Sequence, residues 1–283
     1  MPVKSNYSPV EKIFSWFVYI SVGLFTLFCF APFWMVIIGS FTPEDSLRVN
    51  GFQLFTTRFS LHAYKYLLSG PQIFRSYSVT ILVTVVGTCI AVLITSMFSY
   101  VIAHQKVKYR NILSFVTYFT MLFGAGLVGF YILIANWLGL KDSIWALILP
   151  YLLNPFYAFV LVAFFRTVPY ELYEAATIDG LNDIHIFFRI IWPVSLPAIA
   201  TVSLFYALQY WNDWWLALLF IDNYKLHPLQ IMIRQLISNI NAASYISSGS
   251  ATFKESVPAY GIQLSTVCLT LGPIIILYPF LQR

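Results

Sequence analysis

The chain has 283 residues, of which 59% are hydrophobic and 10% charged, and its formal net charge is +5. Soluble domains carry about 25% charged and about 45–50% apolar residues, so this composition excludes a water-soluble globule and indicates an integral membrane protein. The cations are dispersed along the chain rather than gathered in one stripe, which argues against a nucleic-acid-binding surface.

Six runs with few or no charges are each long enough to cross a bilayer, which takes about 20 apolar residues in a helix. In chain order they are residues 13–39, 76–103, 111–140, 143–165, 190–212 with a continuation past Asp213 to residue 221, and 256–282. The strands of a membrane barrel would alternate apolar and polar residues instead. The sequence therefore predicts an all-α membrane protein with six transmembrane helices in a single permease-like domain, residues 1–283.

The loops between these runs decide the orientation. The first run is too long for the apolar core of a cleaved signal peptide, about 7–15 residues, so we expect a retained helix. The total Lys and Arg count does not discriminate between the two sides. The short segment 104–110 contains Lys106, Lys108 and Arg110, and cations in short loops favour the cytoplasm. We therefore expect both termini and residues 166–189 in the cytoplasm, and residues 41–75 and 222–255 as extracytoplasmic loops.

Catalytic and metal-binding patterns are missing from the sequence. The three cysteines lie singly within apolar runs, and the four histidines are scattered over four segments. Neither set has the spacing of a metal or redox site, and no nucleotide-binding or hydrolase motif occurs. We expect no catalytic residue, no metal and no cofactor bound by this chain.

The segment between the fourth and fifth runs predicts a helix of about three turns at the membrane surface. Thr167 can cap it, and Pro169 suits the first turn, where a missing N–H costs nothing. Glu171 and Glu174 favour the positive end of the helix dipole, and Gly180 is suited to end the helix. Leu172, Ala175 and Ala176 are spaced to form one compact apolar face.

The same segment carries a family resemblance. Glu174, Ala175 and Ala176 are followed by Gly180, Ile190 and Pro193 at the spacing of the EAA motif, which resembles permease subunits of ATP-binding-cassette (ABC) importers. Residues 64–68, 99–103, 138–146 and 211–214 extend the likeness over most of the chain and are similar to the carbohydrate branch, of the MalG/LplC-like type. Trp192 departs from the Leu that is usual before Pro193.

The resemblance implies a type I (MetI-like) permease architecture in a bacterial inner membrane and a role in coupling. The EAA helix would dock on an ATPase, with Glu174 as a polar contact, Ala175 and Ala176 as a close-packed surface, and Asp179 and Gly180 at the turn. The implied partners are a second related permease subunit in a heterodimer, two cytoplasmic ATPase subunits and an extracytoplasmic solute-binding protein. ATP and Mg²⁺ would be bound by the ATPase subunits, so this chain itself is not expected to be an enzyme.

Polar residues within the fourth and fifth runs are candidates for contact with a solute. Tyr206, Gln209, Tyr210 and Asp213 share one helical face, and Asn154 lies in a run interrupted by prolines. Ionisable groups at membrane depth usually face a protein interior or a wet cavity. This face fits a sugar pathway and fits packing against a partner helix equally well.

The resemblance predicts import of an oligosaccharide or polysaccharide. Cations outnumber carboxylates in the expected outer loops, which suits an acidic sugar and suits an acidic docking protein equally. Two alternatives are a permease of the same type for a non-sugar solute and an ATP-independent secondary carrier. The second usually has internal repeats, and none is evident between the two halves of this chain.

Overall fold

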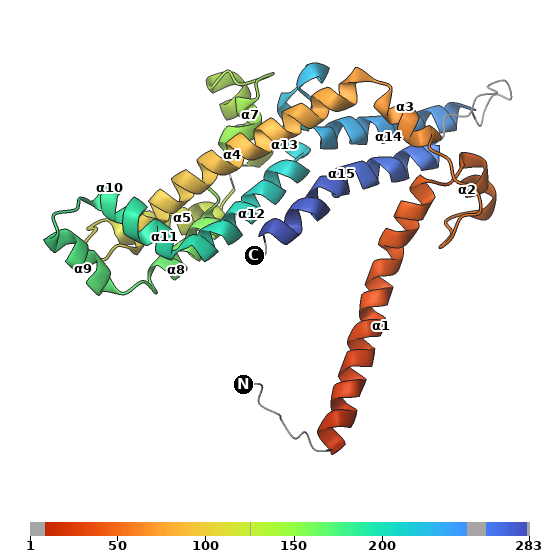
Figure 1. The fold of residues 1–283 in the computed structure, drawn as a ribbon. Helices are drawn as coiled ribbons and strands as arrows, with labels where there is room; N and C mark the ends of the chain where they lie inside the picture. Colours follow the sequence, from red (N-terminus) through yellow and green to blue (C-terminus); the bar gives the residue numbers. More distant parts are fainter. Residues whose placement is uncertain (1–8, 125, 248–258, 282–283) are drawn as a thin grey trace. The chain divides into compact units, whose positions relative to one another are not determined.

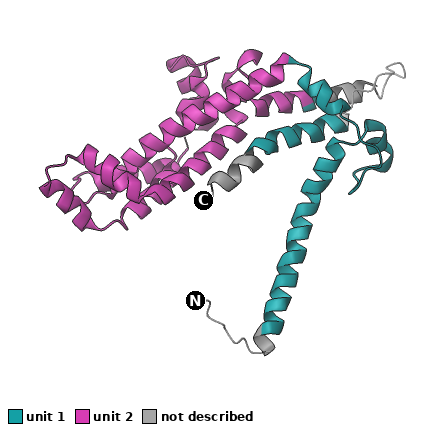
Figure 2. Cartoon of the chain, viewed as in Figure 1, with its two compact units in different colours: residues 1–70, 237–276 teal, residues 71–236, 277–283 magenta. Residues whose placement is uncertain are grey.

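The computed structural model describes the backbone of residues 9–124, 126–247 and 259–281, and the side chains of residues 12–124, 126–239 and 260–273. Within these ranges every regular element is a helix, so the predicted all-α class is confirmed there. The chain forms two compact units, coloured separately in Figure 2. Unit 1 comprises residues 1–70 and 237–276, and unit 2 comprises residues 71–236 and 277–283.

Two long helices, α4 (Pro71–Ala103) and α12 (Leu196–Asn212), form the centre of unit 2 and lie side by side (Figure 1). The buried face of α4 carries small side chains at helical spacing, namely Ser76, Thr80, Gly87, Ala91, Thr95 and Ser99. Small residues allow two helix backbones to approach closely in a membrane, where association depends on packing rather than on exclusion of water. This face therefore explains the close pairing of α4 with α12.

The fourth predicted span is broken in the middle. Helix α7 (Trp145–Ile148) and the 3-10 turn η2 (Leu149–Tyr151) meet α8 (Pro155–Phe165) at an angle of 47°. Pro155 lacks an N–H and disfavours a helical conformation in the residue before it, so the first helix ends there. The break leaves backbone N–H and C=O groups that lipid cannot satisfy.

Hydroxyl groups from α4 and α12 satisfy these backbone groups. The Asn154 N–H donates to the Tyr206 hydroxyl at 2.9 Å, and the Thr95 hydroxyl donates to the Leu152 carbonyl at 3.2 Å. The hydroxyl oxygens of Thr95 and Tyr206 lie 2.6 Å apart. Because Thr95 uses its single hydroxyl proton to bond Leu152, Tyr206 is the donor in the bond between the two hydroxyls. Tyr210 donates to the Ile148 carbonyl at 3.0 Å. Three side chains therefore hold the broken span in place.

Two other predicted spans are also bent pairs. The third contains α5 (Arg110–Leu122), then α6 (Gly126–Tyr131) and the π-helical turn η1 (Ile132–Trp137). The fifth begins at the end of the π-helical turn η3 (Phe187–Ile191) and continues through α11 (Trp192–Val194). Together with the preceding α10 (Asp183–Ile186), these turns meet α12 at 85°. The apolar run from residue 190 to 221 is therefore divided among several helices, with the bend at the segment that contains Pro193 and Pro197. Pro197 cannot donate to the carbonyl four residues earlier, and α12 ends before α13 (Trp215–Phe220).

The count of six membrane spans is not confirmed. Among the described residues, α1 (Pro9–Ser40) and α4 are the two helices long and apolar enough to cross a membrane alone. Counting each of the three bent pairs as one span raises the number to five. The sixth predicted run contains α15 (Ala259–Leu281), and residues 256–258 and 282 lie outside the described residues.

The two segments predicted as outer loops contain helices. Residues 41–75 include α2 (Glu44–Asn50) and α3 (His62–Leu68), while residues 222–255 include the 3-10 turn η4 (Tyr224–Leu226) and α14 (Leu229–Ser247). In unit 1 the Glu44 carboxylate accepts the Gly261 N–H at the start of α15, at 3.0 Å, and forms an ion pair with Arg48 at 3.1 Å. A carboxylate at a helix N-terminus is favoured by the helix dipole.

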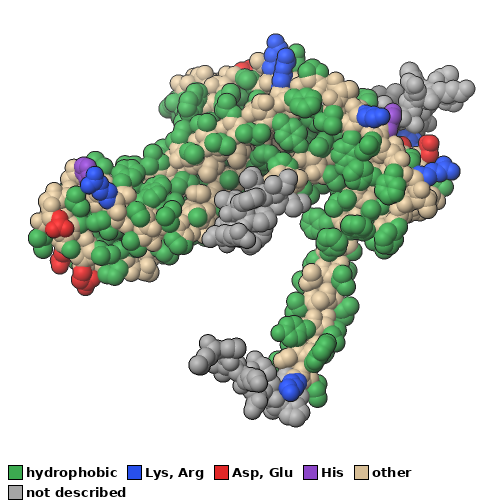
Figure 3. Space-filling model, in the orientation of Figure 1, with side chains coloured by type: hydrophobic (Ala, Val, Ile, Leu, Met, Phe, Trp, Pro, Cys, Tyr) green, Lys and Arg blue, Asp and Glu red, His purple; other side chains and the backbone are tan. Residues whose placement is uncertain are grey.

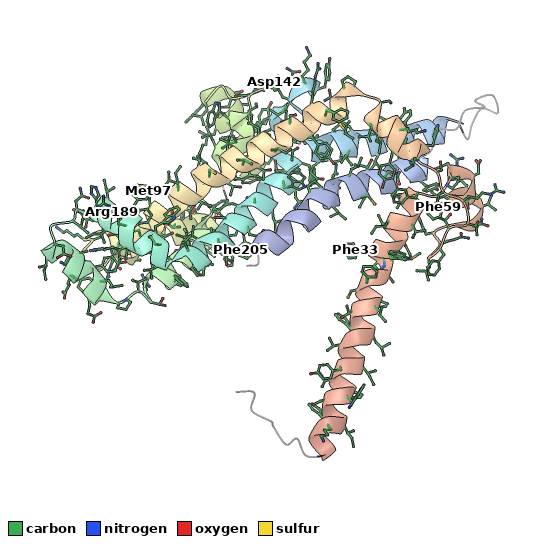
Figure 4. All side chains as sticks on the ribbon, in the orientation of Figure 1. Phe33, Phe59, Met97, Asp142, Arg189 and Phe205 are labelled. Atoms are coloured by element: carbon green, nitrogen blue, oxygen red, sulfur yellow. The ribbon has the colours of Figure 1, made fainter. Side chains whose placement is uncertain are left out.

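Asp142 joins the turn before α7 to the segment after α13 (Figure 4). Its carboxylate accepts the N–H groups of Asp222 and Asn223, both at 2.7 Å, and its own N–H donates to Phe220 at 2.9 Å. The Asn223 N–H holds the pKa of Asp142 below its ordinary value. Asp142 has a φ of 59°, a left-handed conformation that Asp adopts more readily than most residues. Lys141 and Asp222 add an ion pair at 2.8 Å.

We predict that Gly87→Ala destabilises the chain. A Cβ at Gly87 would lie 2.8 Å from Cζ of Tyr210, and this ring cannot move away because it is buried and its hydroxyl bonds to Ile148. Overpacking of this kind costs about 1–3 kcal/mol in the free energy of unfolding. Gly23→Ala is the control, since nothing lies within 4 Å of its Cβ position. Equal thermal stability of the two variants in detergent would contradict close packing of α4 on α12.

Candidate functional site

The segment of residues 166–189 contains the helix that sequence reasoning identified, α9 (Tyr170–Ile178). Its N-cap is Pro169 rather than the predicted Thr167, whose hydroxyl donates instead to the Phe164 carbonyl at 2.7 Å. Thr167 lies too early in the chain to reach the free N–H groups of α9, so the predicted cap is wrong.

The end of α9 is a Schellman motif. Gly180 has a φ of +79°, its N–H donates to Thr177 at 3.0 Å, and the Leu181 N–H donates to Ala176 at 3.0 Å. These two bonds occupy carbonyls that the helix end would otherwise leave free. The predicted role of Gly180 in ending the helix is confirmed.

The two faces of α9 have different environments. Tyr173 and Ala176 are buried against the rest of unit 2. The outward face carries carboxylates and apolar side chains together, namely Glu171, Leu172, Glu174, Ala175, Ile178 and Asp179. The predicted apolar face is therefore divided, because Ala176 points inward while Leu172 and Ala175 are exposed. Figure 3 shows acidic side chains at this end of unit 2.

A cluster of aromatic rings joins the inward face of α9 to the end of α4. Tyr173 stacks on Tyr100 with ring centroids 6.1 Å apart and on Tyr170 at 5.9 Å, and it meets His104 edge to face at 5.3 Å. Tyr100 also contacts Phe187 of η3 at 5.2 Å. We call these five residues the ring cluster. Such pairs contribute about 0.5–1.5 kcal/mol each beyond the area that they bury, so α9 is firmly attached to α4.

Trp192, which departs from the family pattern, packs beside this cluster. Its ring lies 5.5 Å from Phe187 and 6.0 Å from Phe188. Aromatic packing thus continues from α9 to the residue before Pro193, where the chain turns into α12. Figure 4 shows Arg189 at the same end of unit 2.

Burial shifts the pKa of two groups in the ring cluster. It raises the pKa of the Tyr173 hydroxyl to about 12. It lowers the pKa of His104 below its ordinary value, and the nearby Asp183 carboxylate offsets part of that effect. His104 is therefore favoured in the neutral form, in which it can pack against Tyr173. In the described part of the chain, no group of three or more His, Cys, Asp and Glu residues could hold a metal ion.

The structure places the five predicted pathway residues at the broken span and along α12. Asn154 caps α8, since its side-chain oxygen accepts the N–H groups of Phe156 at 2.9 Å and Tyr157 at 3.4 Å. Tyr206 and Tyr210 are buried, and their hydroxyls are bonded within unit 2 as described above. The shared face thus includes two residues with a structural role, and contact with a solute stays a prediction for all five.

Gln209 and Asp213 differ from the two tyrosines. Gln209 Oε1 is buried without a hydrogen-bond partner among the described residues. Asp213 accepts a hydrogen bond from the Tyr151 hydroxyl at 2.9 Å. Sequence reasoning missed Tyr151 because its partner is 62 residues away. It also missed Ile178 as an exposed apolar residue, although Ile178 follows Ala175 by three positions on the same helical face.

We predict that Gly180→Ala destabilises the end of α9 while Gly180→Asn does not. The left-handed conformation costs a residue with a Cβ roughly 1–2 kcal/mol, and Asn tolerates it better than Ala. Amide hydrogen exchange at Leu181, whose N–H closes the motif, should become faster in the Ala variant alone. Equal exchange in both variants would show that the helix end does not depend on this conformation.

The pKa of His104 predicts a loss of stability in mild acid. The unfolded chain binds a proton near pH 6.5, whereas folded His104 does so only at lower pH. The contribution of His104 is therefore complete above about pH 6.5 and is lost as the pH falls below it. His104→Phe keeps an aromatic ring without a titrating group, so its melting temperature should fall less between pH 7.5 and 5.5. Parallel losses in both proteins would contradict this.

Comparisons with known proteins place the chain in a family of transport proteins. Residues 95–283 match the family described as binding-protein-dependent transport system inner membrane component. The polygalacturonan/rhamnogalacturonan transport system permease protein YtcP of Bacillus subtilis (strain 168) is 37% identical over 277 residues, which cover 96% of this chain and 95% of YtcP. Protein LplC of the same strain is 40% identical over 264 residues, covering 93% and 87% of the two chains.

A solved structure supports the fold. A chain from the crystal structure of a bacterial ABC transporter involved in the import of the acidic polysaccharide alginate matches with a TM-score of 0.85 and 24% identity, over 99% of both chains. This likeness supports the predicted importer-permease architecture at the level of the fold. Since the family match spans residues 95–283 and both relatives align along most of their length, the chain belongs to the family of binding-protein-dependent transport system inner membrane components and is a multi-pass inner membrane protein.

Proposed function

We propose that this chain is the pore-forming subunit of an ABC importer for an oligosaccharide or polysaccharide, with acidic sugars as the preferred class. The family is a transport component rather than a catalytic one. The name of YtcP states transport of polygalacturonan and rhamnogalacturonan, and the structural relative takes part in import of alginate. These names support a polymer of acidic sugars over an amino acid or another non-sugar solute.

The proposed assembly contains this chain, a second related permease, two cytoplasmic ATPase subunits that bind ATP and Mg²⁺, and an extracytoplasmic solute-binding protein. The chain would cross the membrane six times with both termini in the cytoplasm. Residues 41–75 and 222–255 would then face outward, where a binding protein could dock.

The outward face of α9 is the observation that carries this proposal. Ile178 is 85% exposed at the end of a helix whose other face is firmly packed. With the exposed Leu172 and Ala175 it gives α9 an outward apolar patch beside Glu174 and Asp179, which suits a protein partner better than lipid or water. Glu174, Ala175 and Ile178 would contact the ATPase, Ala176 would pack inward against unit 2, and Asp179 and Gly180 would form the turn.

Movement of α9 would reach the pathway through the ring cluster. Tyr173 contacts Tyr100 and His104 at the end of α4, and Tyr100 contacts Phe187 before α12. ATP-driven closure of the ATPases would therefore displace the ends of α4 and α12 together. Gln209 and Asp213 are the candidates on α12 for contact with a passing sugar.

The test is ATPase activity of the assembled transporter, reconstituted with its binding protein and an oligogalacturonide. We predict that Ile178→Ala reduces stimulated activity by about tenfold, since a buried apolar side chain contributes about 1.5–3 kcal/mol to an interface. Glu174→Lys should reduce it by about as much, because it reverses the charge of the proposed polar contact with the ATPase. Val128→Ala is the control, because Val128 is an exposed apolar residue of α6, remote in sequence from α9.

Three outcomes would count against the proposal. Full stimulation in both α9 variants would remove α9 from the coupling step. ATPase activity stimulated by an amino acid but not by an oligogalacturonide would show that the transported solute is not a sugar. Uptake by this chain alone, without any ATPase, would identify a secondary carrier.

A further inference from the structure

A second site lies beside the inward face of α9. It is a cavity of about 600 Å³, within the range of about 300–1,000 Å³ that is usual for ligand pockets. Its lining includes two arginines and three aromatic or imidazole rings, namely Arg110, Arg166, His104, Tyr170 and Tyr173, together with Asn111. We call it the basic pocket. It is separate from the outward face of α9, which the proposed function assigns to the ATPase.

The lining of the basic pocket is positively charged, and the Asp183 carboxylate acts on His104 from outside that lining. Its lining includes no Asp or Glu. The two ion pairs in the described part of the chain are Arg48–Glu44 and Lys141–Asp222, so neither Arg110 nor Arg166 has a carboxylate partner there. Lys106 adds a third cation, with its Nζ 5.8 Å from the ring centre of Tyr170.

Two helices begin at the lining of the same pocket. Arg110 and Asn111 are the first two residues of α5, and Tyr170 is the first residue of α9. Neither helix has a side chain that caps its N-terminus. Free N–H groups at helix starts bind anions, so the starts of α5 and α9 add to the charge of the two arginines, and Glu171 in the first turn of α9 offsets part of this effect. The guanidinium groups fit phosphate oxygens in pairs, which favours phosphate over a monovalent halide.

The pocket also lies where membrane-crossing helices end. Ala103 is the last residue of α4, Phe165 is the last of α8, and Arg110 is the first of α5. In a multi-pass inner membrane protein these ends mark the depth of the lipid headgroups, where Tyr side chains are also enriched. Basic pockets between such helices bind anionic headgroups.

We propose that the basic pocket binds the phosphate group of an anionic phospholipid, such as phosphatidylglycerol or cardiolipin. Tyr170 and Tyr173 belong both to the pocket and to the ring cluster. A bound headgroup therefore braces α9 against α4 and makes the attachment of α9 dependent on the lipid. This inference concerns binding and does not depend on the solute class or on the ATPase contact.

The test measures the affinity of phosphatidylglycerol for the assembled transporter in nanodiscs made otherwise of phosphatidylcholine, using native mass spectrometry to count bound lipid. Each of Arg110→Gln and Arg166→Gln should weaken binding on the order of fivefold, and the double variant on the order of 30-fold. The matched control is Lys108→Gln with Arg189→Gln, two exposed cations of neighbouring segments that do not line the pocket. The control should retain native affinity.

The remaining outcomes separate the sources of the phosphate. Displacement of the lipid by millimolar inorganic phosphate, again dependent on both arginines, supports a phosphate site that accepts either source. Equal lipid binding in the native protein and the double variant overturns the proposal. So does loss of the ATPase subunits from the double variant with unchanged lipid affinity, because the pocket would then receive an acidic side chain of the ATPase. If the double variant fails to assemble, the lipid affinity of Arg166→Gln alone tests the proposal, because the Arg166 side chain is exposed and its replacement should leave folding intact.

Discussion

The broken span at residues 152–154 imposes the constraint on which unit 2 depends. A helix that stops inside a membrane leaves N–H and C=O groups that lipid cannot bind, at a cost of several kcal/mol each. Here Thr95, Tyr206 and Tyr210 supply the missing partners through hydrogen bonds to Leu152, Asn154 and Ile148. Since Thr95 belongs to α4 and both tyrosines belong to α12, the break cannot persist unless these two helices stay in register.

Helix α4 joins this constraint to the proposed coupling site. The turns before its last one carry Thr95 and Ser99, whose hydroxyls bond to Leu152 in the break and to Ala158 of α8. Its last turn carries Tyr100, which stacks on Tyr173 of α9. A displacement of α9 therefore acts on one helix that is bonded both to the break and to α8. The short distance along α4 between Thr95 and Tyr100, about one and a half turns, leaves little room for the displacement to be absorbed.

The sequence predicted features that depend on local chemistry. The all-helical class followed from the long apolar runs, α9 from Pro169 and its acidic residues, and its end from Gly180. Features that depend on distant partners could not be predicted. The pattern placed Tyr206 and Tyr210 on one polar face of α12, but only the fold shows that their hydroxyls bond to residues 52 and 62 positions away. Likewise, nothing local distinguishes Ala176, which is buried, from its neighbour Ala175, which is exposed.

The central claim is that α9 and α4 move as one body, and a distance between spin labels tests it directly. One label is placed on the exposed native Cys89 of α4 and the other on Thr177→Cys, an exposed position of α9 outside the proposed ATPase contact, with Cys29 and Cys268 replaced by Ser. In the assembled transporter, we predict one narrow distance distribution that stays unchanged when ATP binds, and a broad one when Tyr173→Ala is added. A distance that shifts with ATP binding in the otherwise native chain would contradict the claim.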